Sequence, residues 1–224
     1  MGSSDFDLTI LESLRPDDHR RRRLDGLSLV GPAHIFEMRV KYRHLATRRE
    51  FLDAVEAYAG RSFALHISAH GGEDGLQTAD DRMISWPRLA RAVKASGEPS
   101  AITFSACAVL ATRSLPDALS DEGLTTWLVG PSAPESDGIG FGDACAAFTQ
   151  FYYVLSAWRT SKPFRRPLST LRSDKEMMRD GLDRMHASSN ADFSYYRWSE
   201  ARGRYVSNDR EDSEKRLAER FANV

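Results

Sequence analysis

A histidine and a cysteine, each at the end of an apolar segment, are the residues best suited to covalent chemistry in this sequence. His70 is followed by Gly71 and closes the segment 62–69, and Cys107 closes the segment 101–106. A cysteine thiolate can attack a carbonyl carbon while a nearby imidazole activates the thiol or protonates the leaving amine. Because glycine has no Cβ, a substrate can approach its N–H closely. We therefore expect His70 and Cys107 to form a catalytic pair, with the N–H groups of Gly71 and Cys107 as an oxyanion hole.

The segments that lead to this pair have the character of buried β-strands. Residues 62–69 (SFALHISA) and 101–106 (AITFSA) are apolar and are bounded by glycine or polar turn residues. Between them, residues 76–86 predict a hairpin that turns near two aspartates, and residues 87–95 predict a helix. If the two parallel strands are neighbours, the imidazole and the thiol lie side by side at one edge of the sheet.

Strands and helices alternate along the rest of the chain. Thr47 with Glu50 predicts a capping box at a helix start, and residues 15–26 predict a polar loop. This alternation predicts an α/β fold with a mostly parallel central sheet of about six strands and helices on both faces, where function gathers at the carboxyl ends of the strands. Further strands are expected at 6–11, 35–42, 126–129 and 193–198, and further helices at 47–59, 141–158 and 173–187.

Length and composition predict a globular chain without covalent staples. Its 224 residues are 41% hydrophobic and 28% charged, with a formal net charge of −1, so no general attraction to nucleic acid or an anionic membrane is expected. Two cysteines make no disulfide framework and suit a reducing compartment. We find no signal peptide and no membrane-spanning segment, and we expect a cytoplasmic protein. One domain is expected over residues 1–198, followed by a charged tail over 199–224.

The two motifs resemble those of the caspase-like (clan CD) cysteine peptidases, and within that group those of the CHAT-domain branch. In that family a hydrophobic strand ends in His-Gly and the next strand ends in Ala-Cys, as at His70-Gly71 and Ser105-Ala106-Cys107 here. The hairpin GLQTADDRMISW, the helix FTQFYYVLSAW and the late SYYRW are also CHAT-like. The resemblance covers residues 5–198, and its specific part is 62–110. The apolar run AVL directly after the cysteine departs from many relatives.

This resemblance implies a fold, an activity and a way of working. The fold is a caspase-like three-layer sandwich, and the activity is endopeptidase cleavage of a protein substrate by a His-Cys dyad, without metal or cofactor. Small chains of this kind resemble bacterial effector proteases, which an activating or regulatory protein partner switches on. A role in defence, including antiviral defence, or in regulated cell death is what the resemblance implies.

Three carboxylates are candidates for the substrate pocket. In caspase-like enzymes the loop after the fifth strand helps to form the S1 pocket, and here that loop carries Glu135 and Asp137. Asp74, just past the histidine motif, is a third candidate, and Ser105 is expected to line the pocket. Acidic groups there favour Arg or Lys at P1 through charge pairing. The alternative is that these carboxylates are ordinary solvated loop residues.

Other residues are interpreted as structural. His66 shares a strand face with the motif histidine, but we expect a core histidine rather than a metal ligand. Cys145 is expected to fill the core of a helix. Ser68 and Ser105 lack the G-x-S-x-G elbow of serine hydrolases, and the GIGFG run at 138–142 lacks the dinucleotide-binding spacing. The basic run at 20–23 is expected to face solvent.

A second hypothesis from a different class remains open. The same fold could serve as a catalytically silent interaction module that docks a larger sensor or partner protein through its charged tail or its aromatic helix. An intact histidine and cysteine argue against this reading without excluding it.

Overall fold

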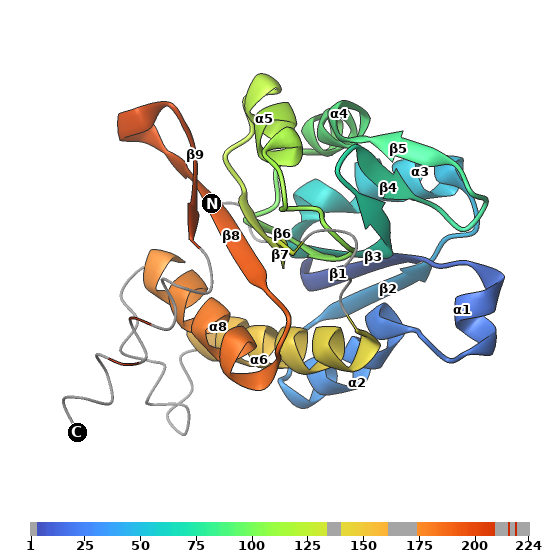
Figure 1. The fold of residues 1–224 in the computed structure, drawn as a ribbon, viewed down its shortest axis with the longest axis horizontal. Helices are drawn as coiled ribbons and strands as arrows, with labels where there is room; N and C mark the ends of the chain where they lie inside the picture. The colour runs from blue at the N-terminus through green and yellow to red at the C-terminus, as the bar shows by residue number, and fades with distance from the viewer. Residues whose placement is uncertain (1–3, 134–139, 161–173, 209–214, 216–217, 219–224) are drawn as a thin grey trace.

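The fold is built on one twisted sheet, seen in a computed structural model that describes residues 4–133, 140–160, 174–208, 215 and 218. The strands that form its main path lie in the order β2-β1-β3-β6-β7-β8-β9, and the hairpin β4–β5 extends from the end of β3. The first five strands of this path are parallel, and β8 and β9 are antiparallel (Figure 1). The strands are β1 (Phe6–Ser13), β2 (Val40–His44), β3 (Ser62–Gly72), β4 (Gly75–Gln77), β5 (Met83–Ser85), β6 (Ala101–Ser105), β7 (Trp127–Pro131), β8 (Phe193–Ser199) and β9 (Arg204–Asn208).

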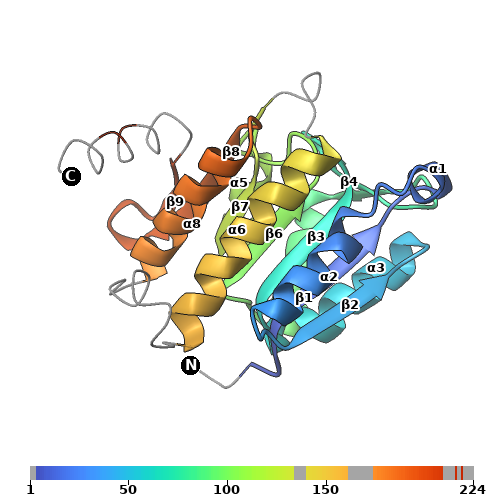
Figure 2. The ribbon, with the colours of Figure 1, turned by 90° about the horizontal axis from the view of Figure 1, so that it is seen from below.

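Helices cover both faces of this sheet, so the predicted α/β architecture is confirmed. Helices α3, α4 and α5 lie on one face, and α2, α6 and α8 lie on the other (Figures 1 and 2). The two faces carry separate apolar clusters, because successive side chains of a strand point to opposite sides. The helices are α1 (Pro16–Arg20), α2 (Asp25–Ile35), α3 (Arg48–Tyr58), α4 (Trp86–Ser96), α5 (Ser114–Asp121), α6 (Phe141–Thr160) and α8 (Asp174–Ser188), with 3-10 turns η1 (Ala59–Arg61) and η4 (Glu200–Arg202).

Local sequence signals located several elements correctly. Thr47 caps α3: its hydroxyl accepts from the Glu50 N–H at 3.2 Å, and the Glu50 carboxylate accepts from the Thr47 N–H at 3.2 Å. The predicted hairpin is the β4–β5 pair, which turns around Asp80 and Asp81. In both cases the residues that define the element are neighbours in the chain, so the pattern is visible in the sequence.

The segment between β1 and β2 was predicted wrongly. Residues 15–26, expected to be a loop, contain α1 and the start of α2, and Pro16 at the first helical position presets the backbone for α1. The strand expected at 35–42 is β2, which begins at Val40 and ends at His44. Ile35 closes α2 with an exposed side chain, and Glu37 has a left-handed φ of 60°, so the alternation of residue types at 35–38 does not reflect an extended backbone.

The expected C-terminal tail begins with part of the sheet. Within residues 199–224, β9 pairs antiparallel with β8. Tyr205 of β9 is buried, and its hydroxyl lies 3.2 Å from the Leu124 carbonyl and 3.0 Å from the Thr126 carbonyl. The described part of the chain contains no helix that is long and apolar enough to cross a membrane.

Candidate active site

The strand that carries His70 near its end and the strand that leads to Cys107 are direct neighbours in the sheet. Strands β3 and β6 are parallel, and their register pairs Ser68 with Ser105 as its last residue pair. His70 and Cys107 each lie two residues beyond that pair, at the carboxyl edge of the sheet. The expectation that these two strands are neighbours is therefore confirmed, and the rule that such edges carry function applies to this point.

Gly71 brings the end of β3 against the residues that follow β6. A Cβ on Gly71 would lie 2.8 Å from the carbonyl oxygen of Cys107 and 2.9 Å from the Cβ of Ala106. No side chain fits in this space without a shift of backbone, which explains glycine at this position. The oxyanion role of Gly71 stays a prediction, while its packing against Cys107 is an observed feature.

Cys107 lies in a tight turn after β6. It is a free, half-buried cysteine. The next residue, Ala108, has a left-handed φ of 54°, and the N–H of Leu110 donates to the carbonyl of Pro131 at 3.0 Å. Ala108, Val109 and Leu110 are all buried. The apolar run after the cysteine therefore anchors this turn against the end of β7.

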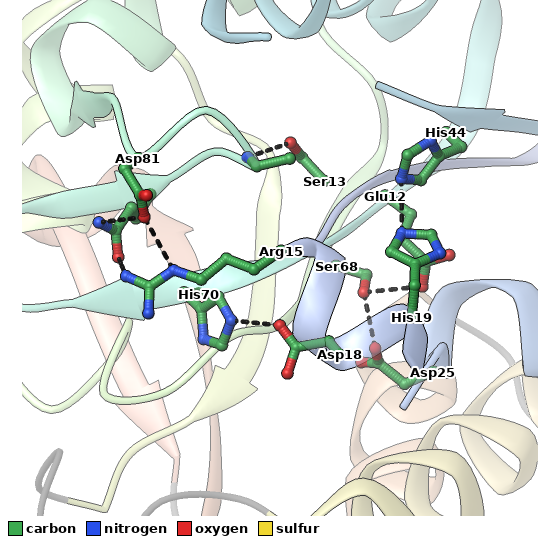
Figure 3. Close-up of polar contacts among 12 residues, drawn as sticks. Glu12, Ser13, Arg15, Asp18, His19, Asp25, His44, Ser68, His70 and Asp81 are labelled. Carbon is green, nitrogen blue, oxygen red and sulfur yellow. Dashed lines mark hydrogen bonds and ion pairs between the residues drawn. The ribbon is translucent and has the colours of Figure 1, made fainter. Parts of the chain in front are cut away.

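His70 has a carboxylate partner that the sequence did not reveal. Its Nε2 lies 2.7 Å from Oδ2 of Asp18, which belongs to α1 (Figure 3). The His70 side chain is 39% exposed and that of Asp18 is 15% exposed. The sequence interpretation missed Asp18 because it treated the segment as a loop. The acidic first turn behind a proline was the signal that could have found α1.

Side-chain contacts tie α1 to the elements around His70. Arg15, which precedes the helix, binds the side chain of Gln77 and lies 2.9 Å from the carboxylate of Asp81. On the other side, Nε2 of His19 lies 2.8 Å from Nε2 of His44, the last residue of β2 (Figure 3). The short helix is thus connected to the hairpin and to the edge strand, with Asp18 between these two connections.

A layer of buried polar groups lies on the α2 side of the sheet, and its member on β3 is two residues before His70. Ser68 donates to Asp25 at 2.7 Å and lies 3.2 Å from the Glu12 carboxylate. Glu12 also accepts from the Gly26 N–H at 2.8 Å and from the Tyr42 hydroxyl at 2.6 Å. Burial is the main cause that raises the pKa of Asp25 to about 6, and the nearby Glu12 charge adds to it.

His66 belongs to the core, as its interpretation predicted. It is fully buried, with Nδ1 3.0 Å from the Thr103 hydroxyl and 2.7 Å from the Tyr152 hydroxyl. Burial lowers its pKa to about 3. His66 therefore stays neutral and has no access to a substrate. Over the residues that the structure describes, no group of three or more His, Cys, Asp or Glu side chains is placed to hold a metal ion.

The remaining predicted residues differ in burial, and two of them lie outside the described part of the chain. Ser105 is buried opposite Ser68, below Cys107 rather than at the surface. Asp74 lies in the turn between β3 and β4 and is exposed. Glu135 and Asp137 lie outside the described residues. Cys145 on α6 is half-buried rather than fully buried, and desolvation raises the pKa of its thiol to about 11.

Comparison with known proteins gives a distant structural likeness. No protein-family model and no curated protein matches this sequence. The fold is similar to the X-ray structure of a secreted C11 cysteine protease from Bacteroides thetaiotaomicron, "iotapain", with a TM-score of 0.49 and 10% identity over 85% of this chain and 65% of that chain. It is also similar to a secreted C11 cysteine protease from the same bacterium in complex with an irreversible peptide inhibitor, with a TM-score of 0.46, 9% identity and the same coverage. The chain spans 65% of the length of these structures, and a likeness this distant carries no conclusion about activity.

Proposed function

We propose that this protein is a cysteine endopeptidase of the caspase-like type, in which Cys107 is the nucleophile and His70 is its acid–base partner. The observation that carries the proposal is the arrangement of β3 and β6. A histidine at the end of β3 and a free, half-buried cysteine just after β6 lie at one edge of the sheet, with Gly71 packed against the cysteine backbone.

The chemistry follows from this pairing. The Cys107 thiolate attacks the scissile carbonyl carbon, and the carbonyl oxygen becomes an oxyanion to which the N–H groups of Gly71 and Cys107 donate. The His70 imidazolium transfers its proton to the leaving amine, so the C–N bond breaks and an acyl-enzyme remains. Water then attacks the thioester while His70 takes one of its two protons, which releases the free thiolate and a carboxylic acid that ionises to the carboxylate in solvent. Each atom that this cycle needs comes from the substrate, water and these residues.

The substrate and its control belong to the same proposal. A protein is the substrate, a P1 Arg or Lys pairs with the acidic residues Asp74, Glu135 and Asp137, and an activating protein partner turns the enzyme on. A role as a regulated bacterial effector in the cytoplasm, of the CHAT-domain branch and linked to defence, follows from the sequence resemblance alone.

Thiol labelling provides a test with a control built into the chain. The protein is treated with a limiting iodoacetamide probe at pH 7, and the adducts on both cysteines are mapped by mass spectrometry. We expect Cys107 to be labelled at least about tenfold faster than Cys145, because the thiolate is the reactive form and desolvation keeps the Cys145 thiol protonated. His70→Ala is expected to slow the labelling of Cys107 and to leave the labelling of Cys145 unchanged.

Peptide cleavage tests the activity itself. A fluorogenic peptide panel that varies only P1 is tested with wild type, Cys107→Ala and Cys145→Ala. We expect cleavage after Arg or Lys by wild type and by Cys145→Ala, and none by Cys107→Ala. If Cys107 is labelled no faster than Cys145 and Cys107→Ala leaves the cleavage unchanged, the protein is not a cysteine peptidase and the silent-module hypothesis takes its place.

A further inference from the structure

The strongest unexplained contact near the candidate pair is the one between His70 and Asp18. The carboxylate oxygen lies 2.7 Å from Nε2 of the imidazole, and the Asp18 side chain is largely shielded from solvent. An aspartate in this position accepts the Nε2–H, which fixes the tautomer and the plane of the ring and leaves Nδ1 as the nitrogen for a second partner.

We propose that Asp18 is a positioning residue that orients His70 toward Cys107, so that the site works as an Asp-His-Cys arrangement. This proposal rests on the proposed peptidase function and deepens it. Asp18 contacts neither the thiol nor the substrate in this role; it acts through the histidine. The carboxylate comes from α1, a segment that joins β1 to α2 and contributes nothing to the sheet.

The connections of α1 distinguish this contact from an ordinary surface ion pair. Arg15 binds Gln77, and Gln77 is the residue directly opposite His70 in the β3–β4 ladder. His19, on the far side of Asp18, contacts His44 at the end of β2. Because the helix is held on both sides of Asp18, little further entropy is lost when the carboxylate contacts His70. In an exposed ion pair, by contrast, the entropy cost of ordering the two side chains offsets most of the attraction.

The charges around His70 leave Asp18 as its one carboxylate contact among the described residues. Arg15 and Asp81 pair with each other, and His19 pairs with His44. In the layer below, the carboxylates of Glu12 and Asp25 are hydrogen-bonded to Ser68. Asp17, the other acid of α1, pairs with Arg20 on the same helix. The imidazolium that forms during catalysis therefore has Asp18 as its counter-ion.

Asp18→Asn removes the charge and keeps the size, and we expect it to lower kcat by about 10- to 100-fold through loss of ring orientation and charge. KM is expected to change less than twofold, because Asp18 does not touch the substrate. Iodoacetamide labelling of Cys107 is expected to become slower, because a ring that is no longer held by Asp18 is oriented less well toward the thiol. Asp18→Glu is expected to recover part of kcat.

Asp17→Asn is the matched control, because it removes a neighbouring carboxylate of the same helix whose side chain is 63% exposed. We expect it to leave kcat, KM and the labelling profile unchanged. Thermal unfolding of all three variants shows whether α1 still folds against the sheet. If Asp18→Asn does not fold, the kcat, KM and Cys107 labelling of Asp18→Glu test the proposal in its place.

Two results would overturn the proposal. One is an Asp18→Asn variant with the kcat and the labelling profile of wild type. The other is a variant with higher activity, since Asp18 would then hold His70 away from the thiol. The labelling measurement needs no substrate, so it also separates this proposal from the peptidase function. A wild type that cleaves nothing refutes the function, whereas an unchanged labelling profile in Asp18→Asn refutes the role of Asp18.

Discussion

Replacement of Asp25 by asparagine should make the protein more stable at neutral pH. Asp25 is buried, and its pKa is raised from 3.8 to about 6, chiefly by burial. A carboxyl group whose pKa is higher in the folded state than in the unfolded chain supports folding fully below pH 3.8 and loses that contribution as the pH rises to 6. Asparagine resembles the neutral acid in size, and its amide oxygen can still accept from Ser68.

The magnitude follows from the size of this pKa shift. At about 1.4 kcal/mol per pKa unit, the ionised Asp25 lowers the free energy of unfolding by about 3 kcal/mol at pH 7 and above. The negative charge of Asp25 in the first turn of α2 interacts favourably with the helix dipole. The asparagine variant loses this interaction, which reduces its gain in stability by about 0.3–1 kcal/mol. The net gain in Asp25→Asn is therefore about 2 kcal/mol at pH 8, and it shrinks toward zero below pH 4.

Urea unfolding at several pH values between 4 and 8 measures this difference. Asp17→Asn is the control: Asp17 is exposed, and its hydrogen bond with Arg20 lowers its pKa, so its replacement brings no gain at neutral pH. A lower stability of Asp25→Asn than of wild type at pH 8, or a difference that does not depend on pH, would refute the reasoning. The hydrogen bond from Ser68 would then outweigh the burial of the charge.

Two further predictions concern the core and the strand ends around the site. Burial lowers the pKa of His66 to about 3, so the neutral ring supports folding fully above pH 6.5. The free energy of unfolding then decreases as the pH falls from 6.5 toward 3, by up to about 1.4 kcal/mol per pH unit. His66→Gln should flatten this part of the pH dependence in urea unfolding; an unchanged slope would mean that His66 is protonated in the folded state. Gly71→Ala places a Cβ 2.8 Å from the Cys107 carbonyl oxygen and should cost about 1–3 kcal/mol and slow thiol labelling at Cys107. Gly142→Ala on α6, with nothing within 4 Å of its added Cβ, is the control, and equal behaviour of the two variants would contradict the close packing of Gly71.

Patterns between residues that are close in the chain were enough to find much of the fold. The apolar run of β3, the capping box of α3 and the β4–β5 hairpin all depend on such neighbours, and each was predicted within a few residues. The same kind of pattern misled at residues 35–38, where apolar and polar residues alternate but the chain ends a helix and turns at Glu37. A periodic pattern describes only the types of the residues. The backbone conformation at 35–38 depends in addition on how α2 packs.

By itself the sequence determined that a histidine-glycine lies at the end of one buried strand and that a cysteine follows another, because residue type and strand character are local properties. Tertiary structure decided that β3 and β6 are neighbours in register, that Gly71 is needed to bring the strand ends together, and that Asp18 contacts His70. It also placed Asp25 and Ser68 in one buried layer. These contacts join residues far apart in the chain, and only the packing of the helices and the order of the strands bring them within a few ångströms.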